Sequence, residues 1–599
     1  MSAFTTRPVI MGTRGVVTSG HYLATAAGFR IMEQGGNAVD AAAAMCFCVN
    51  LLEPQSNGIG GEVPTLIYSA QEKRAFAVCG MGWSPKAFTI DWCRDRGIDL
   101  IPGDGYLPAC VPAVVDTWAV ALARFGTMGF GQVLQPAIEL AENGFAVYPG
   151  LHRALVSNRH KFMQQYPSTG AIYCPDGRVP AVGDILCNHD WAQTLRMMCR
   201  AEAETTGGGR HGGIEAARDA FYKGSIAEQI VDFITEHPVE DASGMAHTGL
   251  LSYEDLAQWH AQVEDPLSCN YHGLDVHKCS SWTQGPVFLQ QLNLLSGFDL
   301  KSMKHNSADY LHTYLECTKL AFADREAYYG DPEHDEVPFD VLLSKRYADQ
   351  RRQLVEETAS LQMRPGGIGH GPPEYAMEDV AENNRCSLQI DARQVTDLGM
   401  GHAHLGDTTH LDAVDSDGNM VAATPSGGWL GTSPVIPGLG FALGTRGQMF
   451  YLNPARPNAL APRKRPRATL TPSLVTRNDE PFMVFGTPGG DSQDQWTLQF
   501  FLNYVHFGMD LQQALDAPSV HSVHFASSFY PRNAFPGRVV VERRISRRVI
   551  TELRRRGHDV LTVDGWAHGK TMGIRRGRRP GLIEGAVSPK GSIGYALGW

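Results

Sequence analysis

The change of hydrophobic pattern at residue 408 constrains the fold of this 599-residue chain most strongly. Before it, long stretches carry apolar residues at helical spacing, as in 20–52, 112–125, 132–143 and 307–329. After it, short segments alternate between apolar and polar residues. "HLDAVDSDGNMVAAT" (410–424) is typical of a strand, a turn at 416–419 and a second strand. The sequence therefore predicts a helix-rich front and a strand-rich back.

The segment between these halves has a different composition. Residues 360–407 are rich in Gly, His, Pro and acidic residues and show little periodicity, as in "MRPGGIGHGPPEYAMEDVAENN" and "LGMGHAHLGD". Such a stretch is typical of a flexible linker. We therefore divide the chain into residues 1–407, which end in this linker, and residues 408–599.

Composition excludes several classes of protein. The net charge of −11 argues against a general nucleic-acid binder. No apolar run reaches the roughly 18 residues of a membrane span, and residues 1–15 lack the apolar core of a signal peptide. The twelve cysteines form no paired CxxC motif, and Cys46 and Cys48 lie in an apolar helical stretch. We expect a cytoplasmic protein with free thiols and no membrane or nucleic-acid partner.

Common hydrolase motifs do not explain the sequence. It contains neither a GxSxG nucleophile elbow nor an HExxH zinc motif. His402, His404 and His410 could suggest a metal site, but no carboxylate follows at a typical ligand spacing. We expect no metal and no cofactor.

Two adjacent threonines, Thr408 and Thr409, stand at the start of the hairpin. A threonine hydroxyl is a weak nucleophile unless a base lies beside it, and its own α-amino group serves once the chain is cut before it. That amine has a pKa of about 7.7–8.0, close to operating pH. Thr408 has the two features this requires: a strand follows it and a loose segment precedes it. Two ordinary β-forming residues at a hairpin edge are the alternative interpretation.

An amidase also needs donors for the negative charge on its intermediate. "GTPGGDS" (486–492) places Gly489 and Gly490 at the end of a predicted strand, where the missing Cβ atoms let a substrate approach the backbone. A simple tight turn would have the same sequence.

Taken together, these segments resemble the γ-glutamyltransferase (γ-glutamyltranspeptidase) family of N-terminal nucleophile hydrolases. The resemblance runs from about residue 8 to the C-terminus. Its markers are "GGNAVDAAAA" (35–44), "EPQSNGIGGE" (53–62), "GLLSYEDLA" (249–257), "KLAFADREAYYGDP" (319–332), "TTHLDAVDSDGNMVAAT" (408–424), "APRKRPRATLTPS" (461–473), "GTPGG" (486–490) and the terminal "GYALGW".

The resemblance implies an α+β fold, a four-layer αββα sandwich built from two subunits of one self-cleaving precursor. The cut would fall between Asp407 and Thr408, giving pieces 1–407 and 408–599 that stay together; a dimer of such heterodimers is one assembly that the sequence leaves open. Thr408 would be the nucleophile and supply the α-amino base, and Ser426 would support it. Gly489 and Gly490 match the oxyanion-hole glycines. Thr469 matches one of two substrate-contacting hydroxyl positions, and the other is Ala468.

The glutamate pocket of the family departs from its pattern. Where the resemblance implies an arginine for the α-carboxylate, the chain has Met81. The positions that would hold the α-amino group are Gly428, Arg446 and Met449. Arg446 would repel an ammonium group and attract a carboxylate. A surface or inter-subunit ion pair is the alternative role of Arg446.

The sequence thus predicts a self-cleaving amidohydrolase that acts, through a threonyl acyl-enzyme, on a small amide with a carboxylate-bearing acyl group. Oxamate-like and glutaryl-type amides are the first candidates. A glutathione hydrolase or γ-glutamyl transpeptidase is the alternative. The sequence does not decide whether the acyl group passes to water, in hydrolysis, or to an amine, in acyl transfer. A processed but inactive scaffold and a metal-dependent hydrolase are the remaining alternatives from other classes.

Overall fold

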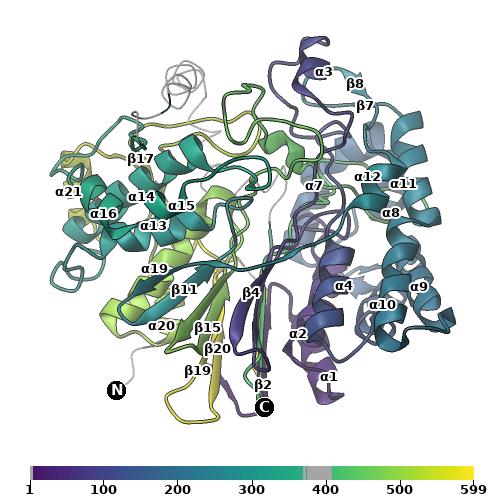
Figure 1. The fold of residues 1–599 in the computed structure, drawn as a ribbon, viewed down its shortest axis with the longest axis horizontal. Helices are drawn as coiled ribbons and strands as arrows, with labels where there is room; N and C mark the ends of the chain where they lie inside the picture. The colour runs from purple at the N-terminus through teal and green to yellow at the C-terminus, as the bar shows by residue number, and fades with distance from the viewer. Residues whose placement is uncertain (1–3, 369–372, 374–407, 592) are drawn as a thin grey trace.

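Two seven-stranded antiparallel sheets packed face to face form the centre of the molecule (Figure 1). The computed structural model describes residues 4–368, 373, 408–591 and 593–599. The first sheet has the order β21 (Tyr595–Gly598), β2 (Gly15–Ser19), β12 (Leu411–Asp415), β13 (Met420–Ala423), β3 (Thr65–Ser69), β4 (Arg74–Val78) and β9 (Val263–Glu264). The second has the order β1 (Ile10–Gly12), β20 (Ile583–Val587), β19 (Met572–Arg576), β15 (Glu480–Gly486), β14 (Ser473–Arg477), β11 (Leu274–Lys278) and β10 (Leu267–Tyr271).

Both sheets mix strands from before and after residue 408. β12 pairs with β2 on one side and with β13 on the other, and β13 pairs with β3. In the second sheet β14 pairs with β11. The front and back of the sequence therefore differ in composition, but they do not fold into separate units.

Strand side chains alternate between two apolar environments. In β13, Met420 and Ala422 belong to the core between the sheets, whereas Val421 and Ala423 belong to the core under the helices. This is the period of two that a pleated strand imposes, with both faces buried. The hairpin that carries Thr408 is thus held from both sides.

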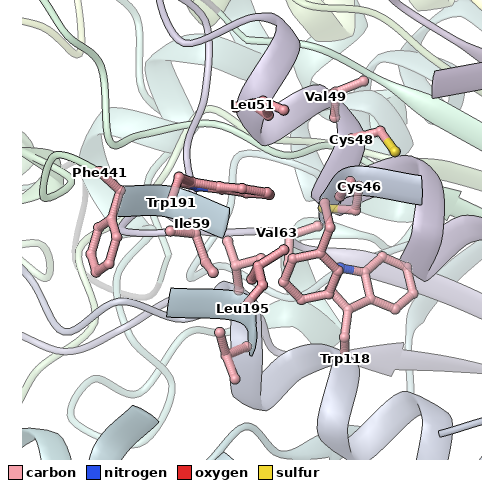
Figure 2. Close-up of a cluster of buried hydrophobic side chains, with 14 of the residues drawn as sticks. Cys46, Cys48, Val49, Leu51, Ile59, Val63, Trp118, Trp191, Leu195 and Phe441 are labelled. Carbon is pink, nitrogen blue, oxygen red and sulfur yellow. The ribbon is translucent and has the colours of Figure 1, made fainter. Parts of the chain in front are cut away.

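Helices α1 (Tyr22–Glu33) and α2 (Ala38–Leu52) cover the first sheet (Figure 1). They separate at 35–36 as predicted, and Asn37 begins α2 in a capping box with Asp40. Every residue of α2 is buried. Figure 2 shows Cys46 and Cys48 inside this apolar cluster, as free thiols, which confirms their predicted role as buried core residues.

Helices α13 (Pro286–Leu295), α14 (Ala308–Tyr328) and α19 (Gln493–Phe507) cover the second sheet (Figure 1). The Ser307 hydroxyl accepts from the backbone N–H of Tyr310 at 3.1 Å, so the predicted N-cap begins α14. Helices on both outer faces and two sheets between them confirm the predicted four-layer αββα sandwich.

The remaining elements surround this sandwich. On the side of the first helix layer lie α4 (Val114–Phe125), α5 (Phe130–Val133), α6 (Gln135–Asn143), α7 (Pro149–Gln164), α8 (Pro167–Tyr173), α9 (His189–Glu204), α10 (Gly209–Tyr222), α11 (Ser225–Glu236) and α12 (Tyr253–Gln258). Helix α3 (Ile90–Arg94) lies at the top of the molecule in Figure 1. Elsewhere lie α15 (Phe339–Leu342), α16 (Lys345–Arg352), α20 (Leu511–Asp516) and α21 (Arg547–Arg555). Smaller sheets pair β16 (Val520–Ser522), β17 (Arg538–Glu542) and β18 (Asp559–Val563), β5 (Phe145–Ala146) with β6 (Ile185–Leu186), and β7 (Val239–Glu240) with β8 (Ala246–His247).

Most of the linker predicted over 360–407 lies outside the described residues. Its described beginning, 360–368, is anchored to α14. The Gly366 N–H donates to Asp324 Oδ1 at 2.8 Å, the Ser360 N–H donates to Glu316 Oε2 at 3.3 Å, and Met363 is buried. These contacts attach the first part of the predicted linker to α14, and the flexibility of the whole segment stays a prediction. Within the described chain, no helix is both long and apolar enough to cross a membrane.

Candidate active site

Thr408 lies just before the hairpin strand β12, which begins at Leu411, so a strand follows it as the sequence predicts. It forms an antiparallel bridge with Ser426, and the Thr409 N–H donates to the Pro425 carbonyl at 3.1 Å. Thr408 is buried, with 3% of its surface exposed. Its Oγ1 lies 3.0 Å from Ser426 Oγ, a hydrogen bond in which either hydroxyl could be the donor. The predicted nucleophile and its predicted supporting hydroxyl are therefore in contact.

Ser426 is held between Thr408 and a residue that sequence reasoning did not assign, Glu62. The Ser426 N–H donates to the Glu62 carbonyl and the Glu62 N–H donates to the Ser426 carbonyl, both at 2.9 Å. This exchange is the hydrogen-bonded pair of an antiparallel ladder. Three short segments, around Thr408, Ser426 and Glu62, thus lie side by side and fix the direction of their side chains.

Arg446, at the start of the 3₁₀ turn Arg446–Met449, completes the group. Its Nη2 donates to Ser426 Oγ at 2.8 Å and its Nε donates to Glu62 Oε1 at 2.6 Å. Burial raises the pKa of the Glu62 carboxyl, and the Arg446 guanidinium opposes that shift. The sequence places Arg446 at one of the positions for the α-amino group, where it would repel an ammonium group and attract a carboxylate. Glu62 supplies a carboxylate there, so the added charge is neutralised by an ion pair between residues from the two sides of position 408.

Glycines give the backbone room for this arrangement. A Cβ on Gly427, at φ +72°, would lie 2.3 Å from Glu62 Oε2. A Cβ on Gly428, at φ +65°, would lie 3.0 Å from the Ala442 carbonyl oxygen and 3.2 Å from the Gly58 Cα. Gly428, predicted to bind substrate, is thus buried against other backbone segments, and its predicted contact with substrate stays a prediction.

His410, weighed as a metal ligand with His402 and His404, is already bonded at both ring nitrogens. It lies between the two sheets, with Nδ1 2.9 Å from Thr424 Oγ1 and Nε2 2.9 Å from Asp412 Oδ1. Burial raises the pKa of Asp412, and His410 opposes the shift. A Cβ on Gly486 would lie 2.3 Å from the His410 ring, so β15 accommodates the imidazole by lacking a side chain there. His402 and His404 lie outside the described residues.

Gly489 and Gly490 lie between the end of β15 and the start of α19. Both have positive φ, +133° and +54°. Backbone N–H groups at a helix N-terminus lack intrahelical partners and favour negative charge. A Cβ on Gly489 would lie 2.2 Å from the Trp496 ring, and one on Gly490 would lie 2.9 Å from the Phe529 ring. The position is suited to an oxyanion hole.

Phe529 connects these glycines to the threonine group. Its ring centre lies 5.7 Å from the Arg446 guanidinium carbon and 6.1 Å from the centre of the Trp429 ring. Trp429 also faces Arg446, at 4.8 Å. Aromatic rings therefore cover Arg446 on the side toward Gly490, and Phe529 is a second site residue that the sequence analysis missed.

Thr469 is buried beside the segment that enters β14. Its neighbour Ala468 bridges Thr283 in parallel, and the Ala468 N–H donates to the Trp282 carbonyl at 2.9 Å. The Thr469 hydroxyl has no hydrogen-bond partner among the described residues. A buried hydroxyl without a partner costs free energy, which favours a role toward a bound group. Met81, by contrast, belongs to the apolar core between the sheets.

A second charged network lies directly behind Gly490. Arg467 donates to Glu326 Oε1 at 2.8 Å and to Ser528 Oγ at 3.2 Å, and the Ser528 N–H donates to Asp491 Oδ2 at 2.9 Å. Arg325 pairs with both carboxylates. Although burial opposes it, the Arg467 and Arg325 guanidiniums hold the pKa of Glu326 well below its ordinary value. The segments "ADRE" (323–326) and "RKRPR" (463–467) were noted in the sequence, but nothing there paired them.

Arg532 is a buried cation of this region, and no carboxylate among the described residues lies within ion-pair distance of it. Its Nη2 donates to the carbonyls of Gln448 and Phe450 at 2.9 and 2.8 Å, and its guanidinium lies 4.1 Å from the centre of the Tyr451 ring. Its Nε and Nη1 have no hydrogen-bond partner in the described chain, and only 5% of the residue is exposed. Burying such a charge is expensive unless something compensates it.

One other group of potential metal ligands was found among the described residues, remote from Thr408 in sequence. His312, Glu316 and His558 lie close together and are buried. His312 Nδ1 lies 2.9 Å from His558 Nε2, and Glu316 already pairs with Lys319 and Arg364. The Glu316 carboxylate is thus bound by two cations and the two imidazoles hydrogen-bond to each other, so this group is a buried hydrogen-bond network.

Comparison with known proteins agrees with this geometry. The family model for gamma-glutamyltranspeptidase matches residues 24–597. A curated relative, the glutathione hydrolase-like YwrD proenzyme of Bacillus subtilis, is 29% identical over 594 residues, covering 98% of this chain and 99% of the relative. The acylase ACY 1 proenzyme of Pseudomonas sp. is 29% identical over 85% of this chain and 82% of the relative.

Solved structures extend the similarity to the whole fold. Two structures of LmbA2991 have TM-scores of 0.90 and 0.89, with 41% identity and full coverage of both chains. A cephalosporin acylase from Bacillus halodurans has a TM-score of 0.82 with 29% identity, covering 100% of this chain and 98% of that one. The chain therefore belongs to the gamma-glutamyltranspeptidase family of N-terminal nucleophile hydrolases, enzymes that act on amide bonds.

Proposed function

We propose that the chain is a self-cleaving amidohydrolase whose nucleophile is Thr408. The observation that carries the proposal is the 3.0 Å contact between Thr408 Oγ1 and Ser426 Oγ, just before β12. The names of the relatives, which include proenzymes, support a precursor that is processed. In this chain the proposed cut lies between Asp407 and Thr408.

Cleavage would proceed by attack of Thr408 Oγ1 on the carbonyl carbon of residue 407. The peptide C–N bond breaks, its nitrogen takes a proton and becomes the new α-amine, and residue 407 is held as an ester. Water then hydrolyses that ester, which releases the carboxyl end of 1–407 and restores the hydroxyl.

The freed amine would then serve as base for the amide substrate. With a pKa of about 7.7–8.0 it can take the hydroxyl proton as Thr408 Oγ1 attacks the substrate carbonyl, and pass it to the leaving amine. The acyl group stays on Thr408 as an ester until water or another amine attacks it. The N–H groups of Gly489 and Gly490 would bind the oxyanion, with the N-terminus of α19 behind them.

We further propose that the acyl group carries a carboxylate. The support now comes from the buried cations behind Gly490 rather than from Arg446, whose charge Glu62 balances. Arg325 and Arg467 pair with the carboxylates of Glu326 and Asp491, whereas no carboxylate among the described residues lies within ion-pair distance of Arg532. A substrate carboxylate would compensate this surplus of positive charge, and Thr469, whose hydroxyl has no partner among the described residues, stands two positions after Arg467 in the sequence. Whether Arg446 also contacts substrate stays a prediction.

Processing is tested by denaturing gel electrophoresis. The wild-type protein should give two bands, one of 192 residues (408–599), and N-terminal sequencing of that fragment should begin at Thr408. Thr408→Ala should leave one full-length band because it removes the attacking hydroxyl. A wild-type enzyme that is active as a single uncut chain would refute the mechanism.

The substrate class is tested with the processed enzyme on oxamate, glutaryl-p-nitroanilide and γ-glutamyl-p-nitroanilide. We expect turnover of the first two, and a raised KM for the glutaryl anilide in Arg532→Gln. Acetyl-p-nitroanilide, which lacks the carboxylate, is the control whose KM should not change. Turnover of γ-glutamyl-p-nitroanilide alone would restore the alternative, a glutathione hydrolase or γ-glutamyl transpeptidase, which the name of the Bacillus subtilis relative favours.

A further inference from the structure

Four side chains form a continuous row that ends at the proposed nucleophile. Glu62 Oε1 accepts from Arg446 Nε at 2.6 Å, Ser426 Oγ accepts from Arg446 Nη2 at 2.8 Å, and Ser426 Oγ lies 3.0 Å from Thr408 Oγ1. All four are buried. The family resemblance assigned no role to Glu62 and expected Arg446 to face substrate.

We propose that Glu62 and Arg446 are positioning residues that act on Thr408 Oγ1 through the Ser426 hydroxyl, in self-cleavage as well as in acyl transfer. The inference depends on the proposed function, because Thr408 must be the nucleophile. It assigns Arg446 to the activation of that nucleophile instead of to the recognition of a substrate carboxylate.

The direction of the hydrogen bonds carries the argument. A guanidinium has donors and no acceptor, so Ser426 Oγ must accept from Arg446. The Ser426 hydroxyl can in turn donate to Thr408 Oγ1, which lies 3.0 Å from Ser426 Oγ. A hydrogen bond from a cation polarises the O–H group that accepts it, which makes that group a stronger donor. As Thr408 loses its proton and its oxygen gains negative charge, Ser426 can stabilise the charge without rearrangement.

The surroundings of Arg446 leave little room for a second carboxylate. Glu62 occupies the edge formed by Nε and Nη2. The rings of Trp429 and Phe529 lie 4.8 and 5.7 Å from the guanidinium carbon, and Nη1 faces Met449 Sδ at 3.8 Å. None of the arginine's surface is exposed. Arg446 is therefore packed as an internal support.

Glu62 is held as firmly as the arginine. Its backbone exchanges two hydrogen bonds with Ser426, and the carboxylate occupies space that Gly427 and Gly444 leave free. A Cβ would lie 2.3 Å from Glu62 Oε2 at Gly427 and 3.2 Å from it at Gly444. A fixed carboxylate fixes the plane of the guanidinium, and that plane aims Nη2 at Ser426.

Self-cleavage tests the inference without any knowledge of the substrate. Precursor made by cell-free synthesis is sampled over time on denaturing gels. Arg446→Lys keeps the charge but replaces the two-pronged donor by a point charge that cannot serve Glu62 and Ser426 together. We expect Arg446→Lys and the neutral pair Glu62→Gln/Arg446→Gln to slow cleavage about 10- to 100-fold. In the processed enzyme kcat should fall similarly with little change in KM.

Arg465→Lys is the matched control, because it perturbs a buried ion pair between an arginine and a carboxylate at a different place in the protein. Arg465 Nε donates to Asp331 Oδ1 at 2.9 Å, and the residue is 5% exposed, but it does not touch Ser426. It should lower the midpoint of thermal unfolding and leave the cleavage rate constant unchanged at temperatures far below that midpoint. This separates positioning from a general effect on stability.

Two results would overturn the inference. One is wild-type cleavage in Arg446→Lys together with a raised KM for carboxylate-bearing amides, which would return Arg446 to substrate recognition. The other is slowing by Arg465→Lys equal to that by Arg446→Lys. Thr408→Ala in the same assay distinguishes failure of the proposed function from failure of this inference. If Thr408→Ala is still cleaved between residues 407 and 408, the proposed function is wrong. If Thr408→Ala is not cleaved but Arg446→Lys is cleaved at the wild-type rate, only the inference is wrong.

Discussion

A methyl group added at Gly489 should disable the oxyanion hole while leaving the threonine group intact. The Cβ of Gly489→Ala would lie 2.2 Å from the Trp496 ring, and ordinary contact begins at 3.4 Å. Ring or backbone must therefore move by about 1.2 Å. Trp496 is buried, stacked on His568 at 5.5 Å and in edge contact with His521 at 5.2 Å, so the ring cannot withdraw easily. The backbone at residue 489 must give way, and its N–H moves with it.

That displacement sets the size of the effect. Loss of one oxyanion donor costs roughly 10²–10³ in rate, or about 2.7–4 kcal/mol of transition-state stabilisation, and an error near 1 Å in position can cost about 10². The positive φ of +133° adds strain for any residue with a Cβ. We expect kcat/KM for glutaryl-p-nitroanilide to fall about 10²- to 10³-fold in Gly489→Ala.

The same helix offers graded controls. Gly508 ends α19 at φ +66°, and no atom lies within 4 Å of the Cβ it would carry; Gly490, at φ +54°, would meet the Phe529 ring at 2.9 Å. The loss should therefore be largest for Gly489→Ala, intermediate for Gly490→Ala and within about threefold of wild type for Gly508→Ala. Rates are normalised to the amount of the 408–599 fragment. Equal rates for Gly489→Ala and Gly508→Ala would refute the placement of the oxyanion hole.

Two further predictions concern buried ion pairs that join the proposed subunits. Lys278 Nζ on β11 lies 3.1 Å from Asp494 Oδ1 on α19, so Lys278→Met should destabilise the protein by about 3–5 kcal/mol because it leaves a buried charge without a partner. The double variant Lys278→Met/Asp494→Asn, which removes both charges, should be destabilised less. A thermal midpoint lower in the double variant than in Lys278→Met would contradict this. The pKa of Glu326 is lower in the folded protein than its unfolded value of about 4.3. The ionised carboxylate therefore contributes its full stabilisation to the free energy of unfolding above about pH 4.3, and this stabilisation is lost as the pH falls through the folded pKa. The difference in thermal midpoint between wild type and Glu326→Gln should hold above about pH 5 and shrink below pH 4; a difference that grows on acidification would reverse the assigned sign.

Local features of the fold could be predicted because they depend on neighbours in sequence. The break between α1 and α2, the Ser307 cap and the hairpin turn each follow from residues within a few positions of one another. Thr408 and Ser426 are 18 positions apart and flank one hairpin, and the family resemblance was sufficient to pair them.

The partner of Arg446 could not be predicted in this way. Glu62 is 384 positions away, and it reaches Arg446 only because its segment lies beside Ser426, next to the β3–β13 ladder. From the sequence, the charge of Arg446 was assigned to a substrate carboxylate, and an ion pair on the surface or between the subunits was the alternative. The compensating acid was present in the motif "SNGIGGE", where five residues before it include three glycines that allow close approach of backbones.

The position of Thr408 in the sheet explains why a cut there should free an amine without loosening the structure. β12 keeps its ladders to β2 and β13 whether or not residue 407 is attached, and β14 keeps its ladder to β11. The ion pairs Glu62–Arg446, Lys278–Asp494 and Glu326–Arg467 each join a residue before the cut to one after it. None of these ladders includes residue 407, so cleavage before Thr408 should destabilise the sandwich little. The contact that orients the nucleophile, Glu62 to Arg446, is thus also one that keeps the two pieces together.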